Sequence, residues 1–174
     1  MKFVHITDTH RVAPRGCLYR LDPKARPDAA VADINRHHDD AELVVVTGDL
    51  THWGEPEAYR YFVVAVQPLP MPWVVLVGNH KRRAECCDVL ASNAPRDPHA
   101  LVQGGRDFPA ARFVFLDTLD ETRHAGPICD TRLGCFAETP ARTPADKPLL
   151  IFMHQPPFEV DVDDRAYAPG PVGS

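Results

Sequence analysis

The sequence predicts an α/β protein, because short apolar segments alternate with longer segments that carry apolar residues at helical spacing. Residues 43–46 form a continuous apolar run rich in valine, which is typical of a strand covered on both faces in a parallel sheet. Ala30, Val31 and Ile34 share one face of an expected helix. A chain of 174 residues buries roughly 70% of its unfolded surface, so we predict a single domain over residues 1–174.

Strands and helices are expected to alternate along most of the chain. The expected strands are residues 3–6, 43–46, 73–77, 112–116 and 149–153. The expected helices are residues 27–38, 55–66 and 81–90. Pro56 suits the first turn of the second helix, where its missing N–H costs nothing. Residues 118–147 show no clear period and are expected to be mostly loop.

Four of the predicted strands run directly into a short loop of metal-binding residue types. These loops are Thr7-Asp8-Thr9-His10, Thr47-Gly48-Asp49-Leu50-Thr51, Gly78-Asn79-His80 and His154-Gln155-Pro156-Pro157. Ligands of open α/β sheets bind beyond the carboxyl ends of the strands, so we expect the polar side chains of the four loops to converge. Mixed carboxylate oxygen and imidazole nitrogen donors suit iron, manganese or zinc. Gly48 and Gly78 would allow tight turns beside a crowded site.

Each of these residues, taken alone, has a simpler explanation. Asp8 could cap a loop, Asn79 could hold a turn, and His10 or His154 could be an ordinary surface histidine. Asp49 is harder to explain in this way, because an uncompensated carboxylate after a buried strand is costly. The joint pattern at four strand ends favours a metal site.

The strings ITDTH, VVVTGDLT, VGNH and FMHQPPF resemble the calcineurin-like metallophosphoesterase superfamily, and most nearly its class III cyclic-nucleotide phosphodiesterases. The resemblance runs from residue 1 to about residue 158 with the four blocks in order. It implies a sandwich of two mixed β-sheets flanked by helices. The blocks are specific for the superfamily and only suggestive of the cyclic-nucleotide branch.

The resemblance also implies a role for each residue of the site. Asp8 and His10 would bind one metal ion, Asn79 and His154 a second, and Asp49 would bridge the two. His80 would be catalytic, stabilising charge on the phosphate or protonating the leaving oxygen. Two divalent cations lower the pKa of a shared water, so a metal-bound hydroxide would attack phosphorus. The implied substrate is a small phosphoester, first of all a cyclic nucleotide such as 3',5'-cyclic AMP.

The chain departs from the family pattern in several places. No Gly-His-x-His block follows His154, so the C-terminal part is expected to be incomplete and each metal to lack one protein ligand. Lys81 stands where the family usually has Asp, and no amphipathic helix is apparent between Gly134 and Pro148. His52 also replaces a common Asp and is expected to be a solvated loop residue. A noncatalytic metal- or nucleotide-binding remnant therefore stays open, as does a phosphomonoesterase or nuclease of the same superfamily.

Composition limits the partners that we expect. The formal charge of −5 and the absence of a basic stripe argue against long nucleic acid and anionic membrane surfaces. The longest apolar runs are too short to span a bilayer, and no apolar segment of signal-peptide length opens the chain, so a cytoplasmic protein is expected. An unfinished sheet edge could favour a homo-oligomer.

Overall fold

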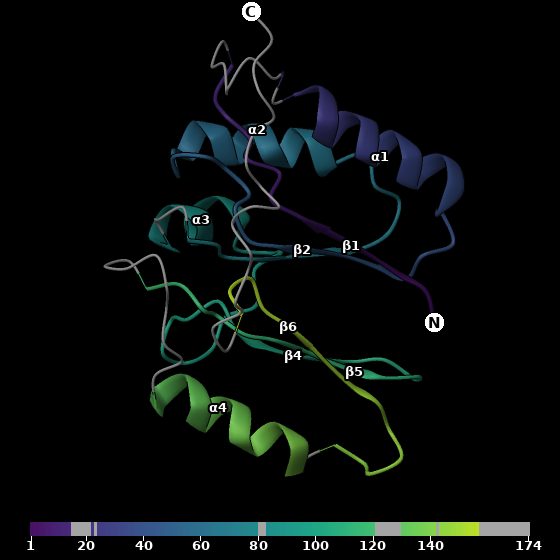
Figure 1. The fold of residues 1–174 in the computed structure, drawn as a ribbon, viewed down its shortest axis with the longest axis vertical. Coiled ribbons are helices and arrows are strands. Elements are labelled where there is room, and N and C mark those ends of the chain that lie inside the picture. Colours follow the sequence, from purple (N-terminus) through teal and green to yellow (C-terminus); the bar gives the residue numbers. More distant parts are fainter. Residues whose placement is uncertain (15–21, 23, 80–82, 121–129, 142, 157–174) are drawn as a thin grey trace, which may run out of the picture.

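Two three-stranded sheets lie face to face in the computed structural model, which describes residues 1–14, 22, 24–79, 83–120, 130–141 and 143–156 (Figure 1). The first sheet has the order β1 (Phe3–Thr7), β2 (Leu43–Thr47), β3 (Trp73–Leu76), and these strands are all parallel. The second sheet joins β4 (Gly104–Asp107), β5 (Arg112–Phe115) and β6 (Leu149–Phe152). It is mixed, because β4 is antiparallel to β5 and β6 is parallel to it.

Helices cover the outer faces of this sandwich. The helices are α1 (Ala25–His37), α2 (Pro56–Val66), α3 (Arg83–Leu90) and α4 (Asp130–Ala141). Figure 1 shows α1 and α2 on the outer side of the first sheet and α4 on the outer side of the second. The predicted α/β sandwich flanked by helices is confirmed. No helix in the described part of the chain has the length and apolar character needed to cross a membrane.

The central strand β2 explains why the first sheet is parallel and covered on both sides. All five of its residues are buried, and Val44 and Val45 are fully buried. A strand without a polar face needs a layer on each side. Val31 and Ile34 of α1 are buried on one side, and the second sheet lies on the other.

Aromatic side chains fill the space between the two sheets. The ring of Phe3 on β1 lies 5.1 Å from that of Phe113 and 5.6 Å from that of Phe152, both edge-on. Phe115 stacks on Phe152 at 5.7 Å. Such pairs are favourable beyond the area they bury, and they hold the end of β6 against the first sheet.

The prediction that residues 118–147 are mostly loop is wrong, because the helix α4 occupies residues 130–141 of this segment. Gly134 and Pro140 are poor helix formers, so local propensity does not reveal the helix. Tertiary contacts stabilise it instead: the guanidinium of Arg132 donates a hydrogen bond to the carbonyl of Leu119. The short strand β4 was also missed, since its sequence, Gly-Gly-Arg-Asp, has no apolar alternation.

Candidate metal centre

The loops after β1 and β2 lie side by side and place polar side chains at one edge of the first sheet. The N–H of His10 donates to the carbonyl of Asp49 at 2.8 Å, and that of Arg11 to the carbonyl of Leu50 at 2.9 Å. Asp8, His10 and Asp49 have positive φ angles of 55°, 42° and 44°. Residues other than glycine rarely adopt this conformation, and such strain concentrates at functional sites.

Asp49 lies at the centre of the group. Its Oδ2 atom is 3.8 Å from Nε2 of His10 and 3.5 Å from Nε2 of His154, and the residue is only 6% exposed. On the outer side, Nε2 of His10 is 3.5 Å from Oδ1 of Asp8. One potential ligand atom each from Asp8, Asp49 and His154 lies within 4.8 Å of the others. The structure therefore brings together side chains from three separate strand ends.

Two glycines make this approach possible. A Cβ atom on Gly48 would lie 2.3 Å from the ring of His154, and Gly48 itself has a φ of 65°. A Cβ atom on Gly78 would lie 2.1 Å from both the backbone nitrogen and Oδ1 of Asp49. Real Cβ contacts are never this short, so the tight turns expected at Gly48 and Gly78 are required by the crowding.

His154 is oriented by its backbone neighbour. Its Nδ1 atom is 3.1 Å from the carbonyl oxygen of Thr47, so the proton on Nδ1 donates there and Nε2 faces Asp49. Burial lowers the pKa of His154, but the carboxylate of Asp49 and the Thr47 carbonyl raise it, and the net shift is upward. An imidazole whose free nitrogen faces a carboxylate in this way is arranged to accept a cation between the two.

Asn79 brings an oxygen without a hydrogen-bond partner to the same strand edge. Its Oδ1 atom is buried and accepts no hydrogen bond from any residue that the structure describes. Buried polar atoms are normally satisfied, so an acceptor without a donor in the loop after β3 is suited to a cation. Together with the carboxylates and imidazoles, this oxygen makes a donor set that fits divalent metal ions.

His52 was expected to be a solvated loop residue, and the structure shows otherwise. It is half-buried, and its Nδ1 atom is 3.2 Å from Nδ1 of His10, so one ring donates to the other. The ring of Trp53 packs against His52 at 4.8 Å. Because His52 contacts the side of His10 remote from Asp49, it can fix the orientation of that ring. The sequence gives one indication of this contact: His52 stands three residues after Asp49, in the loop that runs beside His10.

Two residues singled out from the sequence lie outside the described residues: His80, expected to be catalytic, and Lys81, which departs from the family pattern. The five predicted metal ligands are all described. Asp8, His10, Asp49 and His154 form a contiguous cluster, and Asn79 follows the neighbouring strand β3.

An α/β sandwich with this polar cluster at its strand ends is the arrangement that the resemblance to metallophosphoesterases implied. The chain belongs to the calcineurin-like phosphoesterase family, whose profile matches residues 1–171. Membership of this family implies the binding of divalent metal ions, although it does not fix their number or identity. The resemblance seen in the four sequence blocks is thus confirmed.

Several curated proteins are similar to the chain. A probable cyclic nucleotide phosphodiesterase, RPA0124 of Rhodopseudomonas palustris, is 46% identical over 91% of this chain and 58% of its own length. The cAMP/cGMP dual specificity phosphodiesterase MT0825 of Mycobacterium tuberculosis is 33% identical over 92% and 51%. The glycerophosphodiester phosphodiesterase GpdQ of Enterobacter lignolyticus is 30% identical over 91% and 58%. The chain thus spans between half and three-fifths of the length of these relatives.

A solved structure supports the fold independently. The purple acid phosphatase PPD1 from yellow lupin seeds matches with a TM-score of 0.65 at 17% identity, over 87% of this chain and 30% of the phosphatase. Identity this low shows a shared fold and no more.

Proposed function

We propose that this chain forms the metal centre of a phosphodiesterase that hydrolyses small phosphodiesters, with cyclic nucleotides as the first substrate class. The observation that carries the proposal is the position of Asp49. One oxygen of this buried carboxylate lies 3.8 Å from His10 and 3.5 Å from His154, as a bridge between two metal ions requires. When bound, two divalent cations polarise a phosphoryl group and lower the pKa of a water.

The protein residues have separable roles in this proposal. Asp8 and His10 hold one metal ion, Asn79 and His154 the other, and Asp49 lies between them. Thr7 positions Asp8, because its hydroxyl donates a hydrogen bond to Oδ2 of Asp8 at 2.6 Å and leaves Oδ1 facing His10. His80 is assigned to the leaving oxygen from its place directly after Asn79 in the sequence.

The substrate class rests on the named relatives. Two of them act, by name, on cyclic nucleotides and one on glycerophosphodiesters. All three names describe cleavage of a diester of phosphate, so a diester is the shared requirement. The net charge of −5 disfavours a polyanionic substrate such as long nucleic acid.

The test is a metal titration followed by hydrolysis assays. The purified chain is reconstituted with Mn²⁺, its metal content is measured by mass spectrometry, and turnover of cyclic AMP, cyclic GMP, glycerophosphocholine and an aryl phosphodiester is recorded. Asp49→Asn removes the bridge, and we expect it to abolish turnover and reduce bound metal. Asp33→Asn on α1, which makes the same charge change on an exposed helix face, is the matched control.

The outcomes separate the proposed functions. Turnover lost in Asp49→Asn and kept in Asp33→Asn supports the phosphodiesterase. A folded protein that binds metal and nucleotide without turning over any diester would show instead a noncatalytic member of the family. If an aryl phosphomonoester, assayed beside these four diesters, is hydrolysed faster than any of them, the proposed substrate class is contradicted.

A further inference from the structure

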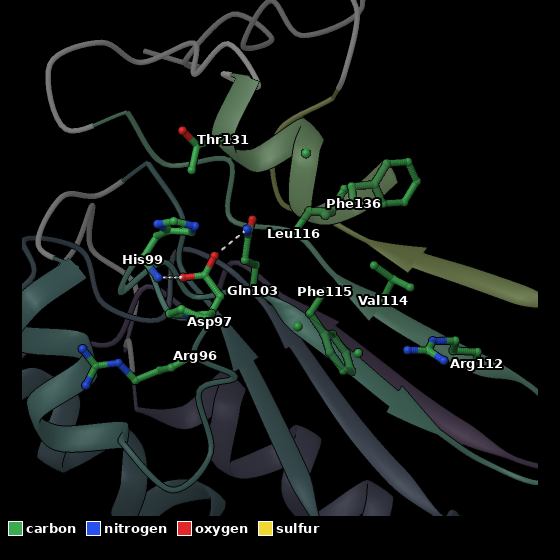
Figure 2. A pocket seen from close by; sticks show the side chains of 14 residues that line it. Arg96, Asp97, His99, Gln103, Arg112, Val114, Phe115, Leu116, Thr131 and Phe136 are labelled. Atoms are coloured by element: carbon green, nitrogen blue, oxygen red, sulfur yellow. Dashed lines mark hydrogen bonds between the residues drawn. The ribbon is translucent and has the colours of Figure 1, made fainter. Parts of the chain in front are cut away.

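A cavity separate from the strand-end cluster lies between α4 and the second sheet (Figure 2). Its volume is about 790 Å³, and residues of β4, β5, α4 and the segment from Arg96 to Gln103 line it. Of the described residues of the candidate metal centre, none lines this cavity. Cavities of roughly 300–1,000 Å³ hold drug-sized or nucleoside-sized molecules. The proposed phosphodiesterase activity does not account for this space.

Gln103 presents an unsatisfied acceptor at the cavity wall. The residue is only 2% exposed, and its Nε2 atom donates to Oδ2 of Asp97 at 2.7 Å. Asp97 is itself held by the backbone N–H groups of His99 and Leu101, both 2.9 Å from its Oδ1 atom. A carboxylate only accepts, so the NH₂ of Gln103 must face Asp97.

The carbonyl oxygen of Gln103 is therefore left without a donor. Figure 2 shows the amide extending toward α4, and no described residue hydrogen-bonds to its Oε1 atom. Leaving a buried acceptor unsatisfied is unfavourable, unless a ligand donates to it. A molecule in the cavity that carries an N–H or O–H group would remove this cost.

Glycines keep the cavity open where other residues would be favoured. Gly134 lies within α4, where glycine is less favourable than alanine, and a Cβ atom there would meet nothing within 4 Å. Gly104 and Gly105 begin β4, and glycine inside a strand often marks close approach of a ligand. All three glycines line the cavity.

The remaining walls define the shape and polarity of the occupant. Val114 and Phe136 provide apolar surfaces on the sheet and on α4. Arg112 lies opposite Asp107 in the β4–β5 pair and contacts its carboxylate through Nη1 at 3.3 Å. A Cβ atom on Gly105 would lie 3.4 Å from Nη2 of Arg112, and the buried Nε of Arg112 donates to no described residue. The occupant therefore needs flat apolar faces, a donor for Gln103 and an acceptor for Arg112.

We propose that this cavity binds a nucleoside. A planar base has apolar faces and carries N–H donors on its edge for Gln103, and the ribose and ring nitrogens supply acceptors for Arg112. The proposal does not depend on catalysis at the strand-end cluster, because a neutral nucleoside has no phosphate to place between metal ions.

The test is direct binding of neutral nucleosides to the full chain without metal. Adenosine, guanosine, cytidine and uridine are titrated calorimetrically in the presence of a chelator, which removes any contribution from a metal centre. We expect one of them to bind one-to-one with a dissociation constant of about 1 mM or below.

Variants of α4 test whether the nucleoside binds in the cavity. Gly134→Leu extends a side chain into the open space and is expected to weaken binding at least about tenfold, since it occupies volume that the ligand needs. Gly134→Ala makes the same improvement in helix propensity without filling the cavity, so it should bind as the wild-type chain does. Thr131→Trp, one helical turn earlier on the same face, is a second filling variant if Gly134→Leu does not fold.

Each result supports or overturns the proposal. Binding lost in the filling variants and kept in Gly134→Ala supports it. No measurable binding of any of the four nucleosides, or equal binding in Gly134→Leu and Gly134→Ala, overturns it. Phosphodiester turnover measured on the same samples reports on the proposed function separately.

Discussion

Asp117→Asn should destabilise the protein strongly, because Asp117 joins the second sheet to two helices. The residue follows β5, is 1% exposed and accepts four hydrogen bonds. Arg83 at the start of α3 donates to it through Nε at 2.7 Å and Nη2 at 3.2 Å. The backbone N–H groups of Val102 and Leu119 donate at 2.9 Å each. Arg132 of α4 lies 4.0 Å away.

The magnitude follows from how the four donors are divided between the two oxygens. Each oxygen of Asp117 accepts one bond from Arg83 and one from a backbone N–H. Asparagine would turn an NH₂ group toward one of these donor pairs, so one neutral and one charged hydrogen bond would be lost. These contribute about 1 and about 1.5–3 kcal/mol. Breaking a buried ion pair typically costs about 3–5 kcal/mol, so we expect a loss of about 3 kcal/mol or more.

Urea unfolding of Asp117→Asn beside Asp107→Asn measures this difference. Asp107 also has two cationic partners, Arg112 and Lys147, each at 3.3 Å, but its side chain is 57% exposed. Exposed pairs of this kind contribute about 0–1 kcal/mol. If the free energies of unfolding of the two variants agree within about 0.5 kcal/mol, the reasoning from burial is refuted.

Three further predictions concern the turns, a buried thiol and the metal. Gly48→Ala should lower the free energy of unfolding by about 1–3 kcal/mol, because its Cβ would meet His154. Gly134→Ala should raise the free energy of unfolding by about 0.5–1 kcal/mol. If the urea midpoints of the two variants shift in the same direction, this prediction is contradicted. Burial, together with Cys87 and Asp117, raises the pKa of the Cys86 thiol above its ordinary value of 9.0. Because the unfolded thiol ionises at a lower pH than the buried one, the contribution of Cys86 to the free energy of unfolding is fully present below pH 9 and is lost as the pH rises further. Cys86→Ala should therefore flatten the decline of the free energy of unfolding between about pH 9 and 11, and an unchanged slope would count against this reasoning. Mn²⁺ at a hundredfold excess over its dissociation constant should add about 2.7 kcal/mol to wild-type stability and nothing in Asp49→Asn, as measured by thermal unfolding; an equal gain in both would exclude Asp49 as a ligand.

The elements of the first sheet and its helices could be predicted because local pattern and tertiary environment agree there. The apolar run of β2 is fully buried in the structure, and Pro56 opens α2 as expected. The strand ends then follow, because parallel strands place their carboxyl ends at one edge. This is why Asp8 and Asp49 could be identified as neighbours, whereas His154 follows β6 of the second sheet and lies beside Asp49 because the two sheets pack face to face.

The second sheet and the helix α4 that packs on it were harder to predict, since tertiary contacts outweigh local preference there. The helix α4 contains Gly134 and Pro140, and Arg132 anchors it to a carbonyl that no local pattern identifies. Asp117 has no sequence signal either, because its four donors come from three separate segments. Hydrogen-bond networks between distant segments are invisible to periodicity, and the His10–His52 contact belongs to the same class.

The left-handed backbone at Asp8, His10 and Asp49 has a consequence for protein engineering. Each such residue costs of order 1–3 kcal/mol, and glycine would relieve most of that cost. A library selected for heat resistance alone would therefore enrich glycine at these three positions and discard the carboxylates and the imidazole with it. In the absence of metal, the stability of the chain and its proposed metal affinity oppose each other here, so variants of this chain need to be screened for both at once.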